Sequence, residues 1–473
     1  MWSHLRARRS LLAGLLAVAA LAVSLLAQSA PQAARQPRAT TISFTEHRLK
    51  NGLRVILSED HSAPTYSICV TYNVGSRDER PGRTGFAHLF EHMMFQGSEN
   101  VGKGEHFILV LNNGGGMNGT TNPDRTNYFQ TLPANQLDLG LFLEADRMRS
   151  LVINQANLDN QRHAVQEERR LGVDNQPYGR TFEVLLETAY DNFAYKHSTI
   201  GSMEDLNAAT VEDVAEFFRI YYAPNNAVLT LVGDFDSRVA LQKIEKYFGN
   251  IPAQPPPPEP DMTEPEQKAE RRATVEDAFA RLPRLDVVFK IPPGNTPDWY
   301  ALDMLGDILG SGQSSRLYER LVRREQLAIA AFAGAEMRRG PSLFNVVALA
   351  RPGVSPDALE KAIHEELERL RTAPVEDWEI EKVRMQLRRQ RAQSLVSTLA
   401  RAIQLGQLAV YFNDPGLINT IEEKYARITK EDLLRVAQTY LQPTRRTVVL
   451  TLPKPQPAQG PPAQPSGQSE PGR

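Results

Sequence analysis

The chain has only one cysteine among its 473 residues. Cys69 therefore has no intramolecular disulfide partner, so no internal disulfide can form. It lies in a mostly apolar run from Tyr66 to Tyr72, where a free cysteine behaves as a small apolar side chain. We expect this run to form a strand with Cys69 in the core.

The chain also lacks an excess of charge of one sign. Its 54 Lys and Arg residues and 56 Asp and Glu residues give a formal net charge of −2, which argues against a general electrostatic attraction to nucleic acid. No phosphate-binding P-loop or dinucleotide-binding fingerprint is present. Apolar residues make up 41% and charged residues 23%, as in folded globular proteins, and the length fits two or three domains.

Acidic residues are missing from the sequence before Glu46. Three arginines at the start of the chain precede a 17-residue apolar run, Leu11–Ala27, and small residues follow it. This order is typical of an export signal, which we predict over residues 1–30, followed by a flexible segment over 31–41. The protein is therefore expected to be exported, to the bacterial periplasm or the medium.

Other interpretations of this segment exist. Arg8-Arg9 fits a twin-arginine signal, and the lack of acidic residues fits a mitochondrial transit peptide. Transit peptides are amphipathic, however, and this run is apolar all round, which favours secretion. An uncleaved signal would anchor the chain, because 17 residues nearly span a bilayer, and this is the only membrane contact we expect. No cysteine lies in the cleavage zone directly after the run, which argues against a lipoprotein.

The most informative motif is His88-Leu89-Phe90-Glu91-His92, which reads H-x-x-E-H. We predict a helix over Phe86–Phe95 with Thr84 as its N-cap. Positions i, i+3 and i+4 share one helix face, so His88, Glu91 and His92 can converge. Two imidazoles there form half of a tetrahedral zinc site, and the glutamate can act on a water that the metal activates. The alternative is a pair of histidines on an ordinary helix surface.

A catalytic zinc site requires a third protein ligand. The predicted helix Leu158–Gly172 offers His163, Glu167 and Glu168. Spacing alone does not choose among these three residues. The alternative is that the run is simply a solvated, charged helix face.

A proline-rich stretch divides the chain. Residues 252–268 are predicted to be a stiff extended linker between an N-terminal domain, 42–251, and a C-terminal domain, 269–453. The tail, 454–473, is rich in Pro, Gln, Gly and Ser and is expected to be disordered.

The two halves look duplicated. Five residues of the first half recur exactly 219 positions later, as Thr210/Thr429, Glu212/Glu431, Asp213/Asp432, Tyr221/Tyr440 and Pro224/Pro443. At the same offset, His88, Glu91 and His92 fall on Asp307, Gly310 and Ser311. Only the first half therefore carries the metal motif.

These features together resemble the M16 peptidases, the pitrilysin and mitochondrial-processing-peptidase group. The resemblance rests on the H-x-x-E-H motif, the stretch from Gly114 to Tyr128 and the Glu167-Glu168 pair, and it covers nearly the whole chain after the predicted signal. It implies two homologous α+β domains, each a mostly antiparallel sheet covered by helices. It also implies that Glu168, 76 residues after His92 (168 − 92 = 76), is the third zinc ligand.

The chemistry that follows is that of a zinc-dependent endopeptidase or oligopeptidase. With zinc held by His88, His92 and Glu168, Glu91 is expected to be the general base that takes a proton from the attacking water and delivers it to the leaving amine.

The resemblance also implies how a peptide binds. The segment Asn118–Tyr128 would be an exposed edge strand beside the zinc, to which an extended or unfolded peptide adds as a further strand. Asn118 and Thr120 are accordingly predicted to bind substrate; the alternative for Asn118 is a turn residue. By its own pattern, Thr120–Leu132 is expected to form a single strand with an irregular start.

The chain departs from the family pattern at two positions. The family usually has a glutamate seven residues before the third ligand, where this chain has Gln161; this puts support of the ligands in doubt. A substrate-binding arginine of the second half matches Arg316, but the tyrosine expected 13 residues later is Ile329. We therefore predict a partner, a second M16-like subunit that carries the Arg/Tyr pair, with a homodimer as the alternative.

Two rival functions are a non-catalytic scaffold or assembly subunit and a zinc hydrolase acting on a non-peptide substrate. Non-catalytic relatives tend to lose a ligand or the base, whereas His88, Glu91, His92 and Glu168 are all present. The peptide-binding segment disfavours the non-peptide substrate. The sequence therefore favours a peptidase.

Overall fold

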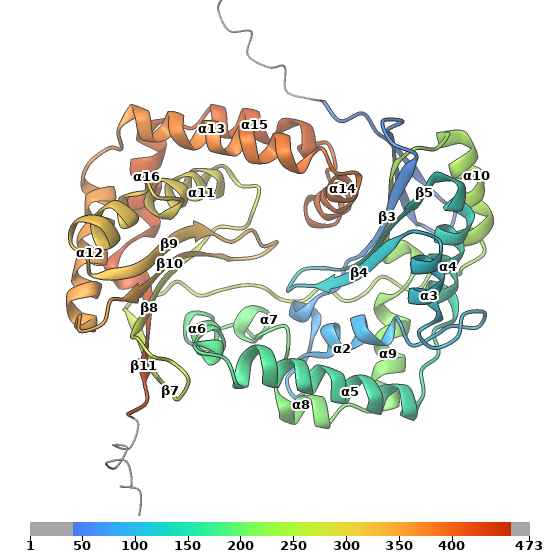
Figure 1. Cartoon of the computed structure of the whole chain (residues 1–473), viewed down its shortest axis with the longest axis horizontal. Helices are drawn as coiled ribbons and strands as arrows, with labels where there is room; N and C mark the ends of the chain where they lie inside the picture. The colour runs from blue at the N-terminus through green and yellow to red at the C-terminus, as the bar shows by residue number, and fades with distance from the viewer. Residues whose placement is uncertain (1–40, 456–473) are drawn as a thin grey trace, which may run out of the picture. The chain divides into compact units, whose positions relative to one another are not determined.

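A computed structural model of the chain describes residues 41–455 (Figure 1). The predicted export signal, nearly all of the segment 31–41 and most of the tail lie outside these residues. The described part contains two sheets covered by helices, which confirms the expected fold class.

The first sheet has six strands in the order β1-β2-β6-β3-β5-β4. All neighbouring pairs are antiparallel except β2 and β6, which are parallel. Strand β4 lies at one edge and pairs only with β5 in this sheet. The strands are β1 (Thr45–Arg48), β2 (Arg54–Glu59), β3 (Thr65–Tyr72), β4 (Gly116–Thr121), β5 (Thr126–Pro133) and β6 (Ala227–Gly233).

The second sheet has five strands in the order β7-β11-β8-β10-β9. It is antiparallel except for the pair β7 and β11. The strands are β7 (Arg271–Asp277), β8 (Arg284–Ile291), β9 (Ala328–Ala335), β10 (Ser342–Ala350) and β11 (Arg446–Pro453).

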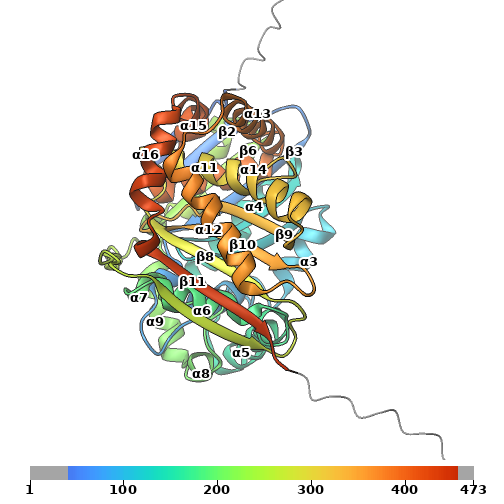
Figure 2. The same cartoon turned by 90° about the vertical axis from the view of Figure 1, so that its left-hand side faces the viewer.

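Helices of each half pack mainly around its own sheet, as Figures 1 and 2 show. Those of the first half are α2 (Phe86–Met93), α3 (Glu105–Asn112), α4 (Leu137–Ser150), α5 (Gln155–Arg169), α6 (Gly179–Ala189), α7 (Phe193–Lys196), α8 (Met203–Asn207), α9 (Val211–Tyr221) and α10 (Ser237–Phe248). Those of the second half are α11 (Pro297–Gly310), α12 (Pro356–Thr372), α13 (Asp377–Ser394), α14 (Thr398–Phe412), α15 (Leu417–Ala426) and α16 (Lys430–Tyr440).

The duplication seen in the sequence corresponds to repeated local structure. Thr210 caps α9 and Thr429 caps α16, each accepting from the backbone N–H three residues on, at 3.1 and 3.2 Å. In both copies an aspartate at that third position completes a capping box. Each helix then leads through a proline into a strand, β6 or β11, that lies inside its sheet.

Two local predictions were wrong. Thr84 does not cap α2; its hydroxyl bonds Asp205 at 2.5 Å, and Gly85, with a φ of 84°, occupies the N-cap position. The predicted single strand Thr120–Leu132 is a hairpin of β4 and β5, because Asn122 to Arg125 form a turn. The Asn122 side chain accepts from two backbone N–H groups in this turn, which is the mechanism of an Asx turn.

An exchange of helices between the halves was not expected from the sequence. Helix α14 of the second half packs on β3 and β6 of the first sheet, and α6 of the first half packs on β7 and β11 of the second. The inner strands β3, β6 and β8 are thereby buried on both faces. The face under α14 contains Cys69, which is fully buried, so the predicted core role of this cysteine is confirmed.

The proline-rich stretch 252–268 contains no helix or strand. It is nevertheless anchored, because the Glu264 carboxylate accepts from the Asn192 backbone N–H at 2.8 Å and pairs with Lys290 at 2.7 Å. These contacts tie the stretch to residues before α7 and to β8.

Within residues 41–455, no single helix is long and apolar enough to cross a membrane. Helices α13 and α14 satisfy the length and composition requirements only as a pair, bent by 111°.

The exchanged helix α14 makes an ion pair with the first half that should depend on pH. Hydrogen bonds from Ser62 and Arg401 lower the pKa of Asp60 from 3.8 to about 2. Since the pKa is lowered on folding, the Asp60 carboxylate stabilises the fold above about pH 3.8, and this contribution is lost as the pH falls towards 2. We expect Asp60→Asn to lower the free energy of unfolding by about 1 kcal/mol at neutral pH. In urea titrations, the difference in the free energy of unfolding between wild type and Asp60→Asn should become smaller below pH 4. A difference that is independent of pH would contradict this.

Candidate metal centre

Helix α2 presents the H-x-x-E-H motif from the core of the first half. The other face of the helix is apolar, and Leu89, Phe90 and Met93 are buried in the main core. This packing fixes the rotation of the helix, so that His88, Glu91 and His92 share the remaining face.

The N-terminus of α2 is capped by a buried carboxylate. Glu79 accepts from the backbone N–H groups of Gly85 at 3.0 Å and Ala87 at 2.8 Å, and its Oε2 lies 2.9 Å from His197 Nε2. Burial raises the pKa of Glu79, and the hydrogen bond with His197 opposes this rise. A carboxylate here satisfies N–H groups that have no partner within the helix and also interacts favourably with the helix dipole.

Helix α5 brings a carboxylate to the two histidines. Glu168 Oε2 lies 3.5 Å from His88 Nε2 and 3.4 Å from His92 Nε2, and one ligand atom from each of the three residues lies within 4.8 Å of the others. Glu167 instead pairs with Arg170 at 2.9 Å on the exposed side of the helix. Of the three candidates for the third ligand, only Glu168 belongs to this cluster.

The spacing fits a bound cation. Two ligand atoms about 2.1 Å from a zinc ion, at a tetrahedral angle, lie about 3.4 Å apart. An N–H···O hydrogen bond would be shorter, at about 2.7–3.2 Å. Two imidazole nitrogens and one carboxylate oxygen are a donor set that zinc favours, and the Glu168 side chain is half exposed, so the cluster opens to solvent on one side.

The protonation tendencies of the ligands differ. Burial lowers the pKa of His88 to about 4, so its imidazole is neutral and has a free lone pair at neutral pH. Burial also acts to lower the pKa of His92, but the neighbouring Glu168 raises it overall. The neighbouring His92 imidazole lowers the pKa of Glu168, although burial opposes this. A cation between these groups would replace the proton that they otherwise share.

Glu91 lies beside the cluster and against the edge strand. Its Oε2 accepts from the Thr121 hydroxyl at 2.6 Å, and burial raises its pKa. A side chain at Gly119 would place Cβ 3.0 Å from Glu91 Oε1, so glycine allows β4 to approach this closely. The raised pKa makes the Glu91 carboxylate a stronger base.

The structure places the predicted substrate residues of β4 next to Glu91. Asn118 is exposed on this edge strand. The Thr120 hydroxyl is engaged within the hairpin, since it donates to Asn127 at 2.7 Å and accepts from Arg125 at 2.5 Å. The neighbouring Gln161 side chain also raises the pKa of the His92 imidazole, after the larger effects of burial, Glu168 and Glu91. Gln161 thus stands where it can support His92.

The structure does not join Arg316 to this cluster. Its guanidinium makes two 2.7 Å hydrogen bonds to the Glu379 carboxylate on α13. Ile329, at the position of the expected tyrosine, lies exposed on the edge strand β9.

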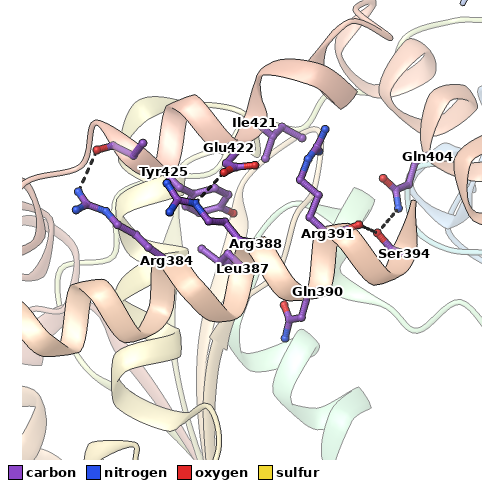
Figure 3. Close-up of a pocket in the computed structure, with 11 residues that line it drawn as sticks. Arg384, Leu387, Arg388, Gln390, Arg391, Ser394, Gln404, Ile421, Glu422 and Tyr425 are labelled. Carbon is purple, nitrogen blue, oxygen red and sulfur yellow. Dashed lines mark hydrogen bonds and ion pairs between the residues drawn. The ribbon is translucent and has the colours of Figure 1, made fainter. Parts of the chain in front are cut away.

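A separate pocket of about 290 Å³ lies between α13 and α15 (Figure 3). Arginines 384, 388 and 391 line it together with Tyr425, and they are bound to neighbouring carboxylate or carbonyl groups. None of the metal-cluster residues lines this pocket, so its chemistry is unrelated to the site.

Sequence reasoning missed Glu79, Thr121 and His197. Glu79 lies seven residues before Phe86, where α2 begins, so no short capping motif marks it. Thr121 lies in the stretch from Gly114 to Tyr128 that resembles the family, but its hydroxyl contact to Glu91 depends on how closely the hairpin approaches α2. These contacts are tertiary and have no local signal.

The buried cap on α2 should contribute measurably to stability. Glu79→Ala would leave the backbone N–H groups of Gly85 and Ala87 without their acceptor and would remove one partner of His197, at a cost of about 1–3 kcal/mol. The measurement is the free energy of unfolding in denaturant, with Glu187→Ala as the control, because Glu187 is exposed on α6. Equal losses in the two variants would rule out the cap.

Comparison with known proteins agrees with this geometry. The family model described as insulinase, peptidase family M16, matches residues 54–203, and the model described as peptidase M16 inactive domain matches residues 208–387. The chain is 32% identical to the zinc protease PqqE of Helicobacter pylori, over 86% of this chain and 92% of that protein.

Solved structures show the same fold. A protease from Helicobacter pylori superposes with a TM-score of 0.84 at 31% identity, covering 87% of this chain and 100% of that one. The periplasmic protease PqqL of Escherichia coli superposes with a TM-score of 0.72 at 18% identity, covering 88% of this chain but 48% of that one; the latter likeness concerns the fold alone. The chain therefore belongs to peptidase family M16.

Proposed function

We propose that this protein is a zinc-dependent endopeptidase or oligopeptidase. The observation that carries the proposal is the cluster of His88, His92 and Glu168, with nitrogen-to-oxygen distances of 3.4 and 3.5 Å, placed beside the buried Glu91. The first-half family model and the zinc-protease relative support it. The family model for the second half is described as inactive, which agrees with a half that lacks the motif.

His88, His92 and Glu168 would hold the ion. Zinc bound there would supply a Lewis acid that activates water and polarises a peptide carbonyl. Glu91 accepts the proton of the attacking water on its carboxylate and passes it to the leaving amine nitrogen. The Thr121 hydroxyl holds one oxygen of Glu91 at 2.6 Å, which orients the carboxylate for this transfer.

The edge strand β4 would bind the substrate. It has no strand partner on its outer side, so an extended peptide can pair with its backbone. Asn118 is exposed and available for a substrate contact, whereas Thr120 would act through its backbone because its hydroxyl is engaged. Backbone pairing reads chain conformation more than sequence, so unfolded or short peptides of varied sequence are the expected substrates.

The proposal also includes an exported location and a partner subunit. The arginines and apolar run of the first 30 residues support a periplasmic or secreted location, and the similar fold of a protein named as a periplasmic protease agrees with it. That protein is about twice as long as the part matched here. A second M16-like subunit with the Arg/Tyr pair, or a second copy of this chain, would supply the corresponding surface.

Glu91→Gln tests the role of the general base. The amide keeps the shape and the Thr121 contact but cannot accept the proton, so turnover of a fluorogenic peptide library should fall by about 100-fold or more while zinc content stays the same. Chelation of zinc should abolish the wild-type activity. Wild-type turnover in Glu91→Gln, or activity that resists chelation, would contradict the proposal.

Adjacent glutamates on α5 offer a matched test of the ligand set. Glu168→Gln should lower zinc affinity by about 10-fold or more, because a neutral amide replaces the anionic ligand. Glu167→Gln removes the same charge one residue away, outside the cluster, and should leave affinity unchanged. Zinc titration with a competing chromophoric chelator measures both. Equal effects would show that Glu168 acts only through its charge.

A further inference from the structure

The turn between β4 and β5 contains a buried carboxylate that the proposed mechanism does not use. The Asp124 side chain is 1% exposed. A charge buried this deeply must be compensated by hydrogen-bond donors, and the identity of these donors shows which parts of the molecule the turn connects.

The donors to Asp124 come from both halves. Within the first half, Oδ1 accepts from the Tyr195 hydroxyl at 2.6 Å and from Arg77 Nη1 at 3.1 Å. From the second half, the backbone N–H of Arg339 donates to Oδ2 at 3.1 Å. Arg339 lies in the turn between β9 and β10, and Figure 1 shows the two hairpins extending towards each other.

Further contacts hold the same junction. Gly340, next to Arg339, donates its backbone N–H to the Tyr195 hydroxyl at 2.9 Å, so Tyr195 bridges Asp124 and the second half. Asn122 bonds the Tyr411 hydroxyl of α14 at 2.9 Å. The β4–β5 turn is therefore fixed against two separate elements of the half that lacks the metal motif.

The β4–β5 turn also lies next to the residue that contacts the proposed general base, Glu91. Asn122 directly follows Thr121, whose hydroxyl holds Glu91 at 2.6 Å. Asn122 Oδ1 accepts from the N–H groups of Asp124 and Arg125 at 2.8 and 2.9 Å, which makes the turn stiff. A shift of Asp124 would thus move the end of β4, and with it both the edge that binds a peptide and the contact to Glu91.

We infer that Asp124 is a positioning residue, through which the metal-free half sets the place of the edge strand β4 relative to Glu91. The second half then contributes to peptide hydrolysis without touching the metal. This inference rests on the proposed peptidase function, but the position of β4 can be measured without any activity.

Asp124→Asn tests the inference with a nearly isosteric change. The amide has one acceptor oxygen in place of two, so its NH2 group must face a donor, either Arg77 or the Arg339 N–H, and the junction between the hairpins should weaken. We expect backbone hydrogen exchange of residues 116–121 to become faster and kcat/KM for extended peptides to fall by about 10- to 100-fold, with zinc affinity unchanged. Asp286→Asn is the matched control, because Asp286 is also buried and bound to an arginine, Arg284, at 2.7 Å, but lies in β8.

Tyr195→Phe provides a second variant in case Asp124→Asn does not fold. It removes one hydroxyl that joins Asp124 to Gly340, and should change exchange and kcat/KM in the same direction by a smaller factor. In the double variant the two effects should be less than additive, since both break one junction. Unchanged exchange in β4, or effects equal to those of Asp286→Asn, would overturn the inference. An inactive wild type with faster exchange in Asp124→Asn would refute the peptidase function alone.

Discussion

The arrangement depends on one constraint: two imidazole nitrogens and one carboxylate oxygen must meet at a single point. The α-helix supplies the first part, since residues four apart project from one face. The second part requires α5 to lie beside α2, so that Glu168 Oε2 comes within 3.5 Å of both histidines. Burial of the apolar face of α2 and the Glu79 carboxylate at its N-terminus fix that helix. The core of the first half thus determines the relative positions of the three candidate ligands.

The second half has a different role. It repeats the capped helix and central strand of the first half, but Asp307 stands at the position of His88, and no metal-ligand set is found around it among the described residues. The second half instead contributes packing and hydrogen bonds to the first half. Helix α14 buries the second face of the first sheet, and the β9–β10 turn holds the end of the edge strand through Asp124. A duplicated domain that has no ligands of its own can in this way stabilise the strand that its counterpart uses.

Much of the site could be predicted from the sequence because its signals are local or spaced regularly. The i, i+3, i+4 pattern predicted one shared face for His88, Glu91 and His92, the family spacing predicted Glu168, and the structure brings His88, His92 and Glu168 together. The features that were missed depend on contacts distant in sequence. Thr84 is a residue type that often caps helices, but its hydroxyl donates a hydrogen bond to Asp205, which is distant in the sequence. Strands β4 and β5 were merged because the Asn122 turn lies within a β-like run. The exchange of α6 and α14 could not be predicted either. The apolar periodicity of a helix shows which face is buried, but not which sheet that face packs on.

The central claim is that these three side chains bind zinc as a catalytic site does. X-ray absorption at the zinc edge of the metal-loaded protein measures this directly. The account predicts one zinc per chain with four light ligands at about 2.0–2.1 Å, two of them imidazoles, and the loss of one imidazole in His88→Ala. Six oxygen ligands, or a spectrum that His88→Ala leaves unchanged, would contradict it.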